Sequence, residues 1–213
     1  MSRSARRALC LALVAAVPVG AAAAGCSDSG GTASAPPSVT AADASLPLTA
    51  RVVRGRELTG FVAGPARPLG LAAVAKENDV TVAELRRRGV ERAAKSELAG
   101  PPRSFGISAV ARLGTPEQAR AEVARLFAAN GSSEPGLTAV PIAVPGIPGA
   151  MGARKTGRHE GQDYVAIEVA WPDGVLAHEL FVLARARDLD QAAVLAAATA
   201  VATRAEGAPL PSA

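Results

Sequence analysis

Cys26 is the residue whose type and position point most clearly to chemistry. It directly follows Ala23, Ala24 and Gly25, and small residues of this kind precede the cleavage site of export signals. Upstream of them lie a basic segment and an apolar run over residues 8–24. That run is shorter than the roughly 20 residues that span a bilayer comfortably. These features predict a signal peptide over residues 1–25 and a thiol at the new N-terminus, where it can be modified.

The Ala-Ala-Gly-Cys sequence resembles the lipobox of bacterial lipoproteins, although Ala23 stands where leucine or valine is more usual. The resemblance implies that Cys26 carries lipid, including acyl chains such as palmitate. That lipid would hold the chain on the outer face of the cytoplasmic membrane, because several acyl chains together anchor firmly. An ordinary secretory signal cut near Ala24 and an uncleaved membrane anchor are the alternatives.

The rest of the chain divides by composition. Residues 26–45 are rich in Ser, Gly, Ala, Thr and Pro, which predicts a flexible linker. Residues 46–206 are long enough for a single domain, and residues 207–213 form a tail. Loss of residues 1–25 removes three arginines, so basic residues fall from 23 to 20 against 19 acidic ones. A chain this close to neutral lacks the basic surface that nucleic-acid binding needs.

The remaining reactive side chains form no catalytic or metal-binding pattern. Cys10 leaves with the signal peptide, so the domain has no thiol for a disulfide, a metal or a nucleophile. His178-Glu179 begins like a zinc-binding helix motif, but Val182 stands at the second ligand position and the segment predicts a strand. His159 lies in a polar turn. We therefore expect no catalytic, metal or cofactor site, and no cofactor.

Two further features could contact a ligand. The first is a possible binding loop whose prolines fix the backbone and whose glycines allow close approach; a rigid connector is the alternative. It consists of Pro145, Gly146, Ile147, Pro148 and Gly149. The second is the run Arg86–Arg88, which suits anionic lipid headgroups or polymer phosphate; a solvated helix face is the favoured alternative. Asp188 and Asp190 are explained by the start of a helix.

Local signals predict the elements that must position these residues. Thr81 with Glu84, and Thr115 with Pro116 and Gln118, are typical of helix N-termini. Alternating or continuous apolar residues predict strands, and Pro172-Asp173-Gly174 predicts a hairpin turn. The expected helices cover 69–76, begin after Thr81 and Thr115, and start at Asp188; the expected strands cover 90–98, 105–113, 137–144, 164–171 and 175–184.

The order of these elements predicts an α+β fold, with an antiparallel sheet and helices packed on one face. Residues 111–119 and 184–192 can be aligned without gaps, and each lies between a strand and a capped helix. Two strand–strand–helix repeats would explain this, and chance similarity in an Ala- and Arg-rich chain is the alternative.

Four segments resemble a group of uncharacterised secreted lipoproteins of high-GC actinobacteria. They are 50–61 (ARVVRGRELTGF), 85–93 (LRRRGVERA), 144–152 (VPGIPGAMG) and the final strand and helix. Ala153 replaces the aromatic residue usual in that group. The resemblance implies localisation and fold, and no activity.

Together these observations lead us to expect a non-enzymatic domain in the cell envelope that binds a ligand or an envelope protein. A carrier of a small apolar molecule or lipid, and a cell-envelope hydrolase, are the alternatives. The partners we expect are the membrane, through lipid on Cys26, and an envelope protein or small ligand.

Overall fold

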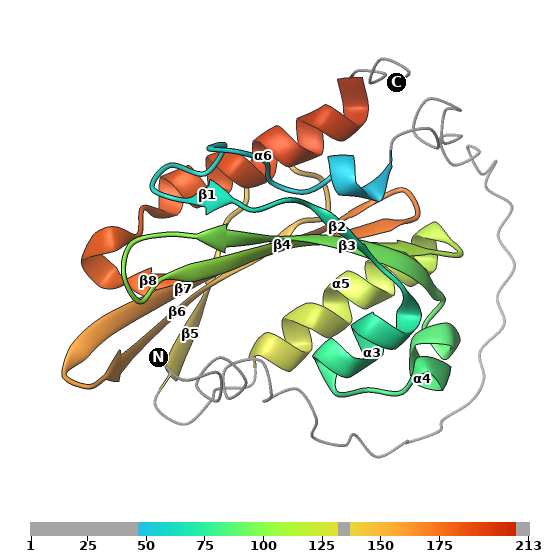
Figure 1. Ribbon diagram of the computed structural model, residues 1–213, viewed down its shortest axis with the longest axis horizontal. Coiled ribbons are helices and arrows are strands. Elements are labelled where there is room, and N and C mark those ends of the chain that lie inside the picture. Colours follow the sequence, from blue (N-terminus) through green and yellow to red (C-terminus); the bar gives the residue numbers. More distant parts are fainter. Residues whose placement is uncertain (1–46, 132–136, 208–213) are drawn as a thin grey trace, which may run out of the picture.

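The computed structural model describes residues 47–131 and 137–207. Within them an eight-stranded antiparallel sheet crosses the molecule, with helices above and below it (Figure 1). The strand order is β1-β3-β4-β8-β7-β6-β5, and β2 also pairs with β3. Cys26 and the predicted linker lie outside the described residues.

The strands are β1 (Val62–Ala63), β2 (Arg67–Leu69), β3 (Val90–Ala99), β4 (Phe105–Leu113), β5 (Leu137–Ile142), β6 (Met151–His159), β7 (Gln162–Asp173) and β8 (Leu176–Arg185). The helices are η1 (Leu48–Ala50), α3 (Leu71–Asn78), α4 (Val82–Arg87), α5 (Pro116–Gly131), η2 (Ala186–Asp188) and α6 (Gln191–Gly207). No helix in these ranges is long and apolar enough to cross a membrane.

The helix starts follow from side-chain caps. The Thr81 hydroxyl accepts a hydrogen bond from the backbone N–H of Glu84 at 3.1 Å. At α5, Thr115 and Gln118 cap each other's backbone N–H, at 3.2 and 3.0 Å. Each bond satisfies an N–H that has no partner inside its helix. Both predicted N-termini are therefore confirmed.

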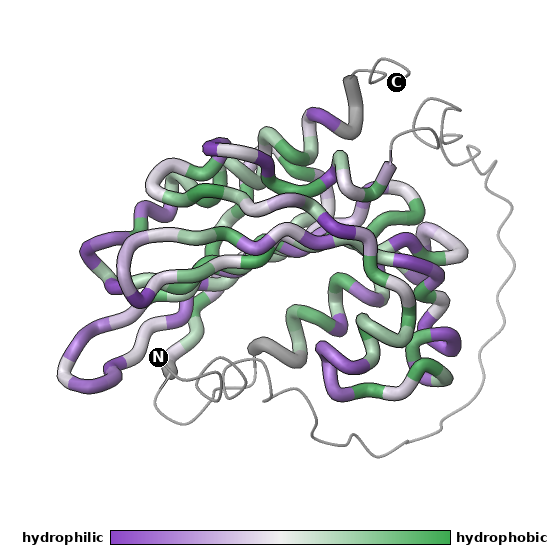
Figure 2. The backbone as a smooth tube through the Cα atoms, viewed as in Figure 1, coloured by the Kyte–Doolittle hydropathy of each residue, from purple (hydrophilic) through white to green (hydrophobic). Residues whose placement is uncertain are grey.

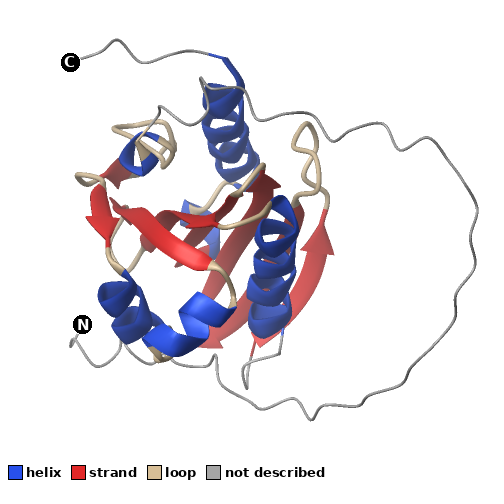
Figure 3. Cartoon of the chain, turned by 90° about the vertical axis from the view of Figure 1, so that its right-hand side faces the viewer, coloured by secondary structure: helices blue, strands red, loops and turns tan. Residues whose placement is uncertain are grey.

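The α+β class and the antiparallel sheet are confirmed, but helices cover both faces of the sheet instead of one (Figures 1 and 3). The main core packs α6 against Val165, Ile167 and Val169 of β7. A second cluster, on the opposite face, includes Ala170 of β7 and residues of α5. The reason lies in β7, which is apolar on both faces and must be covered on both.

The strand–strand–helix order does occur twice, as β3-β4-α5 and β7-β8-α6. Because α5 and α6 lie on opposite faces of the sheet, one unit cannot be rotated onto the other. The similarity of residues 111–119 and 184–192 therefore reflects the shared step from a strand to a helix start.

One strand was not expected, and the last helix begins later than the sequence predicts. The unexpected strand is β6, which pairs with β7 over its full length and with β5 over Gly152–Gly157. The last helix begins at Gln191, and Asp190 caps it by accepting from the N–H of Ala192 at 2.9 Å. Asp188 ends the preceding 3-10 turn. Only one of the two predicted aspartates therefore caps α6.

Hydrophobic positions run through the middle of the sheet and along α6, while hydrophilic ones gather at the β6–β7 turn (Figure 2). The segment before β1 joins this core through Val53 and Leu58, both 1% exposed. Arg204 of α6 holds that segment by donating to the carbonyls of Ala50 and Val52, at 3.1 and 3.0 Å. The start of the domain is thus tied to its last helix.

Candidate functional site

Two glutamates lie on the face of the sheet that α5 covers. Glu168 of β7 pairs directly with Phe181 of β8, and Glu179 lies two residues before Phe181. Because side chains two residues apart on a strand share a face, these three project to the same side. Ala170, the β7 partner of Glu179, packs with residues of α5. The two carboxyl groups therefore face the helix layer.

Glu168 is fully buried and paired with a cation. Its carboxylate lies 3.1 Å from Nζ of Lys155, and the side chains are 0% and 12% exposed. The register explains this pair. Lys155 of β6 stands opposite Ala166 of β7, and Ala166 precedes Glu168 by two residues and so lies on the same face. A buried carboxylate needs such a partner to remain charged.

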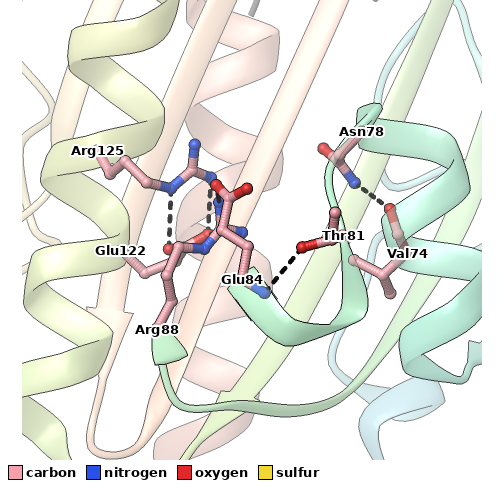
Figure 4. Close-up of polar contacts among 7 residues, drawn as sticks. All are labelled: Val74, Asn78, Thr81, Glu84, Arg88, Glu122 and Arg125. Carbon is pink, nitrogen blue, oxygen red and sulfur yellow. Dashed lines mark hydrogen bonds and ion pairs between the residues drawn. The ribbon is translucent and has the colours of Figure 1, made fainter. Parts of the chain in front are cut away.

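The helices that cover this face of the sheet contribute a second charged group (Figure 4). Arg125 donates to both carboxylate oxygens of Glu122, at 3.0 and 2.7 Å. Arg88, which follows α4, donates to the same carboxylate at 3.2 Å. Glu122 is 7% exposed, so this network joins α4 to α5 next to the sheet. Of the predicted run Arg86–Arg88, Arg88 is engaged in this way and the other two are exposed.

Glu179 differs from Glu168 and Glu122 in its polar surroundings. In the part of the chain that the structure describes, no side chain forms a hydrogen bond or an ion pair with it. Burial among the surrounding protein atoms, followed by the nearby Glu168 carboxylate, raises the pKa of Glu179 to about 7. The side chain nevertheless keeps part of its solvent exposure. Its carboxyl group therefore gains or loses a proton near neutral pH.

A strip of apolar side chains continues from Glu179 along β8 and β4. We define the apolar strip as Phe105, Ile107, Phe181 and Leu183. The register places Ile107 opposite Phe181 and Phe105 opposite Leu183. The rings of Phe105 and Phe181 lie 5.8 Å apart. All four are half-buried, and none belongs to the three hydrophobic clusters that make up the described core.

His178 points to the opposite face and is only 1% exposed. Its ring stacks on that of Trp171 at 4.8 Å and 4°. Asp173 lies 3.8 Å from its Nε2 and 3.3 Å from Arg51. Burial lowers the pKa of His178 and outweighs the opposing effect of Asp173. The ring is therefore neutral at pH 7 and forms part of the core below the N-terminal segment.

The predicted binding loop is exposed except at its centre. Pro145, Gly146, Pro148 and Gly149 are exposed, whereas Ile147 is 6% exposed and belongs to the main core. Gly146 and Gly149 have φ of 78° and 69°, values that favour glycine. The loop thus inserts Ile147 into the core and leads into β6. Its role as a ligand rim stays a prediction.

The other residues singled out earlier are separated from this face or undescribed. The His159 side chain is 72% exposed, 3.8 Å from Glu160 at the β6–β7 turn. Cys26 lies outside the described residues. Within the described ranges, no group of three or more His, Cys, Asp or Glu residues could hold a metal ion.

Sequence reasoning overlooked Glu168 and considered Glu179 only as part of a zinc motif that it rejected. The available signal was the single charged residue in the apolar run 164–171, since an isolated glutamate in a buried strand requires a partner. Only the strand register identifies Lys155 as that partner and brings Glu179 beside it.

No family model and no curated protein matches this chain. Among solved structures, the chain is similar to the extracellular domain of PknH from Mycobacterium tuberculosis, with a TM-score of 0.54 and 12% sequence identity. The match covers 75% of this chain and 94% of that one. At this identity the likeness shows the fold alone, so the fold described here also occurs in an extracellular domain of an actinobacterial protein.

Proposed function

We propose that this protein is a lipid-anchored domain on the outer face of the cytoplasmic membrane that binds a small ligand without reacting with it. The anchor is supported by the lipobox-like sequence at Cys26 and by the linker composition of residues 26–45. The extracytoplasmic location is also supported by the fold shared with an extracellular domain.

The observation that carries the binding proposal is the apolar strip beside Glu179. Half-buried aromatic and aliphatic side chains outside the core lie next to a carboxyl group that has no ion pair with any described residue, so apolar area is combined with one polar group. Ligand sites commonly have this composition. Carriage of a small apolar molecule is a second candidate, supported by the same strip.

The arrangement favours binding over hydrolysis. A pair of carboxylates with separate pKa values can serve as acid and nucleophile, but both groups must reach the substrate. Glu168 is 0% exposed and paired with Lys155, and His178 is 1% exposed on the other face. Of these three side chains, Glu179 alone would have to supply acid, base and nucleophile.

The anchor is tested by growing cells that express the full chain with an alkyne analogue of palmitate. We expect label on the wild type and on Cys10→Ser, whose cysteine lies in the predicted signal peptide, and none on Cys26→Ser. Label on Cys26→Ser, or a mature protein that retains Met1, would contradict the anchor.

The binding site is tested with the full chain in lipid nanodiscs and the apolar fluorophore N-phenyl-1-naphthylamine, read against empty nanodiscs. We expect Phe181→Ala to weaken binding. The matched control is Val62→Ala, since Val62 is 50% exposed on β1. Equal binding by the two variants and the wild type would refute the site.

A further inference from the structure

The two basic residues near Glu179 are each paired with a different acid. Lys155 of β6 pairs with Glu168, and Arg125 of α5 pairs with Glu122. Strand β4 contributes Ala109, which stands opposite Glu179 and carries no charge. When Glu179 is ionised, every other charged group facing it therefore already has a partner of opposite charge.

Charged side chains of β6, β7 and α5 act on the Glu179 carboxyl group. Four charged groups act on it, and in order of strength they are Glu168, Arg125, Glu122 and Lys155. Each acid in this series acts more strongly than the base that follows it, so the two acids together outweigh the two bases. A ligand group placed beside Glu179 is consequently favoured if it is positively charged.

The apolar strip begins next to this position and extends away from it. Along β8, Phe181 and Leu183 follow Glu179 on the same face, and a strand rises about 3.3 Å per residue. The strip therefore reaches roughly 13 Å from Glu179 to Leu183. Its β4 side is formed by Ile107 and Phe105. A bound molecule would meet a carboxyl group at one end and apolar side chains along its length.

We propose that Glu179 binds the ammonium group of a small amphiphile whose apolar part lies along the strip formed by Phe105, Ile107, Phe181 and Leu183. This inference rests on the proposed ligand-binding function and adds the chemical class of the ligand. An ammonium group would neutralise Glu179 and donate hydrogen bonds to a carboxylate that receives none from the described part of the chain.

Binding of a cation must compete with binding of a proton. Because burial and Glu168 raise the pKa of Glu179 to about 7, most molecules carry a neutral carboxyl group at pH 6 and a carboxylate at pH 8. A ligand that requires the carboxylate then binds about tenfold more tightly at pH 8 than at pH 6. An uncharged ligand shows no such dependence, and an anionic one shows the reverse.

The test uses the full chain in phosphatidylcholine nanodiscs and titration calorimetry with hexylammonium, hexanol and hexanoate at pH 6 and pH 8. Empty nanodiscs provide the blank for each probe. We expect hexylammonium to bind most tightly of the three and to gain about tenfold in affinity between the two pH values.

Two variants locate the effect. Glu179→Gln should abolish the preference for the amine and its pH dependence, while Asp163→Asn, which removes a 73% exposed acid on the other face of β7, should preserve both. Hexylammonium that binds no better than hexanol, or an unchanged preference in Glu179→Gln, would overturn this inference. If hexanol binds in either case, the proposed ligand-binding function stands without the preference for an amine. If none of the three probes binds, both the proposed function and this inference are contradicted.

Discussion

Replacement of Glu179 by glutamine should stabilise the protein above neutral pH. The pKa of Glu179 is about 7 in the folded protein, whereas a glutamate surrounded by water, as in the unfolded chain, has a pKa of 4.5. The folded state therefore holds this proton more tightly. Between pH 4.5 and pH 7 stability falls as pH rises, because folding then opposes ionisation of the carboxyl group.

The size of the effect follows from the pKa difference. At about 1.4 kcal/mol per pH unit, the penalty at pH 8 has an upper limit of about 3 kcal/mol. Glu179 keeps part of its contact with water, and screening by that water brings the expected value to about 2 kcal/mol. Glutamine has nearly the same shape and no charge, so Glu179→Gln should remove this penalty.

The assay is urea unfolding of the wild type, Glu179→Gln and the control Glu97→Gln at pH 5 and pH 8. We expect Glu179→Gln to exceed the wild type by about 2 kcal/mol at pH 8 and to differ little at pH 5. Glu97 is 66% exposed, so its variant should follow the wild type at both pH values. If the free energies of unfolding of Glu179→Gln and the wild type changed in parallel with pH, the reasoning about the buried charge would be refuted.

Three further substitutions test a helix cap, the ion pair of Glu168, and His178 on the face of the sheet opposite Glu179. Thr81→Ala removes the cap on Glu84 N–H and should cost about 1 kcal/mol of unfolding free energy in urea, whereas the exposed Thr59→Ala should cost nothing measurable. Lys155→Met removes the ion pair of the buried Glu168 and should cost about 3 kcal/mol; adding Glu168→Leu should restore stability, and failure to do so would contradict the assigned pair. His178 has a lowered pKa when folded against 6.5 in its ordinary state, so the unfolded chain takes up its proton first and stability is lost as pH falls below 6.5. His178→Phe keeps the stack on Trp171 and should lose this acid dependence in thermal unfolding; an unchanged dependence would show that another group causes it.

The amino-acid sequence alone was enough to predict most elements. The strand expected over residues 105–113 matches β4 residue for residue, and the caps at Thr81 and Thr115 form as expected. These features depend on residues three or four positions apart, or on alternation along a strand, so the chain carries them locally. Strand β6 was missed because MGARKTGRH has few residues that favour strands, and pairing with β5 and β7 overrides that weak preference.

The faces of the sheet could not be assigned in advance. Apolar residues on both sides of β7 show that both must be covered, but not which helix covers which side. The loop around Ile147 illustrates the same limit, since its sequence suits an exposed rim and its central side chain lies in the core.

Neighbouring residues in the sequence encode the helix starts at Thr81 and Thr115 and the strand hairpin, and lipid attachment at Cys26 is predicted in the same local way and stays a prediction. The environment of Glu179 was decided by the tertiary structure alone. The β7–β8 register puts Glu168 beside it, β6 supplies Lys155, and α5 adds Glu122 and Arg125. A carboxyl group changes its proton affinity only when distant segments remove water and bring charges close, and no local pattern in the sequence encodes that.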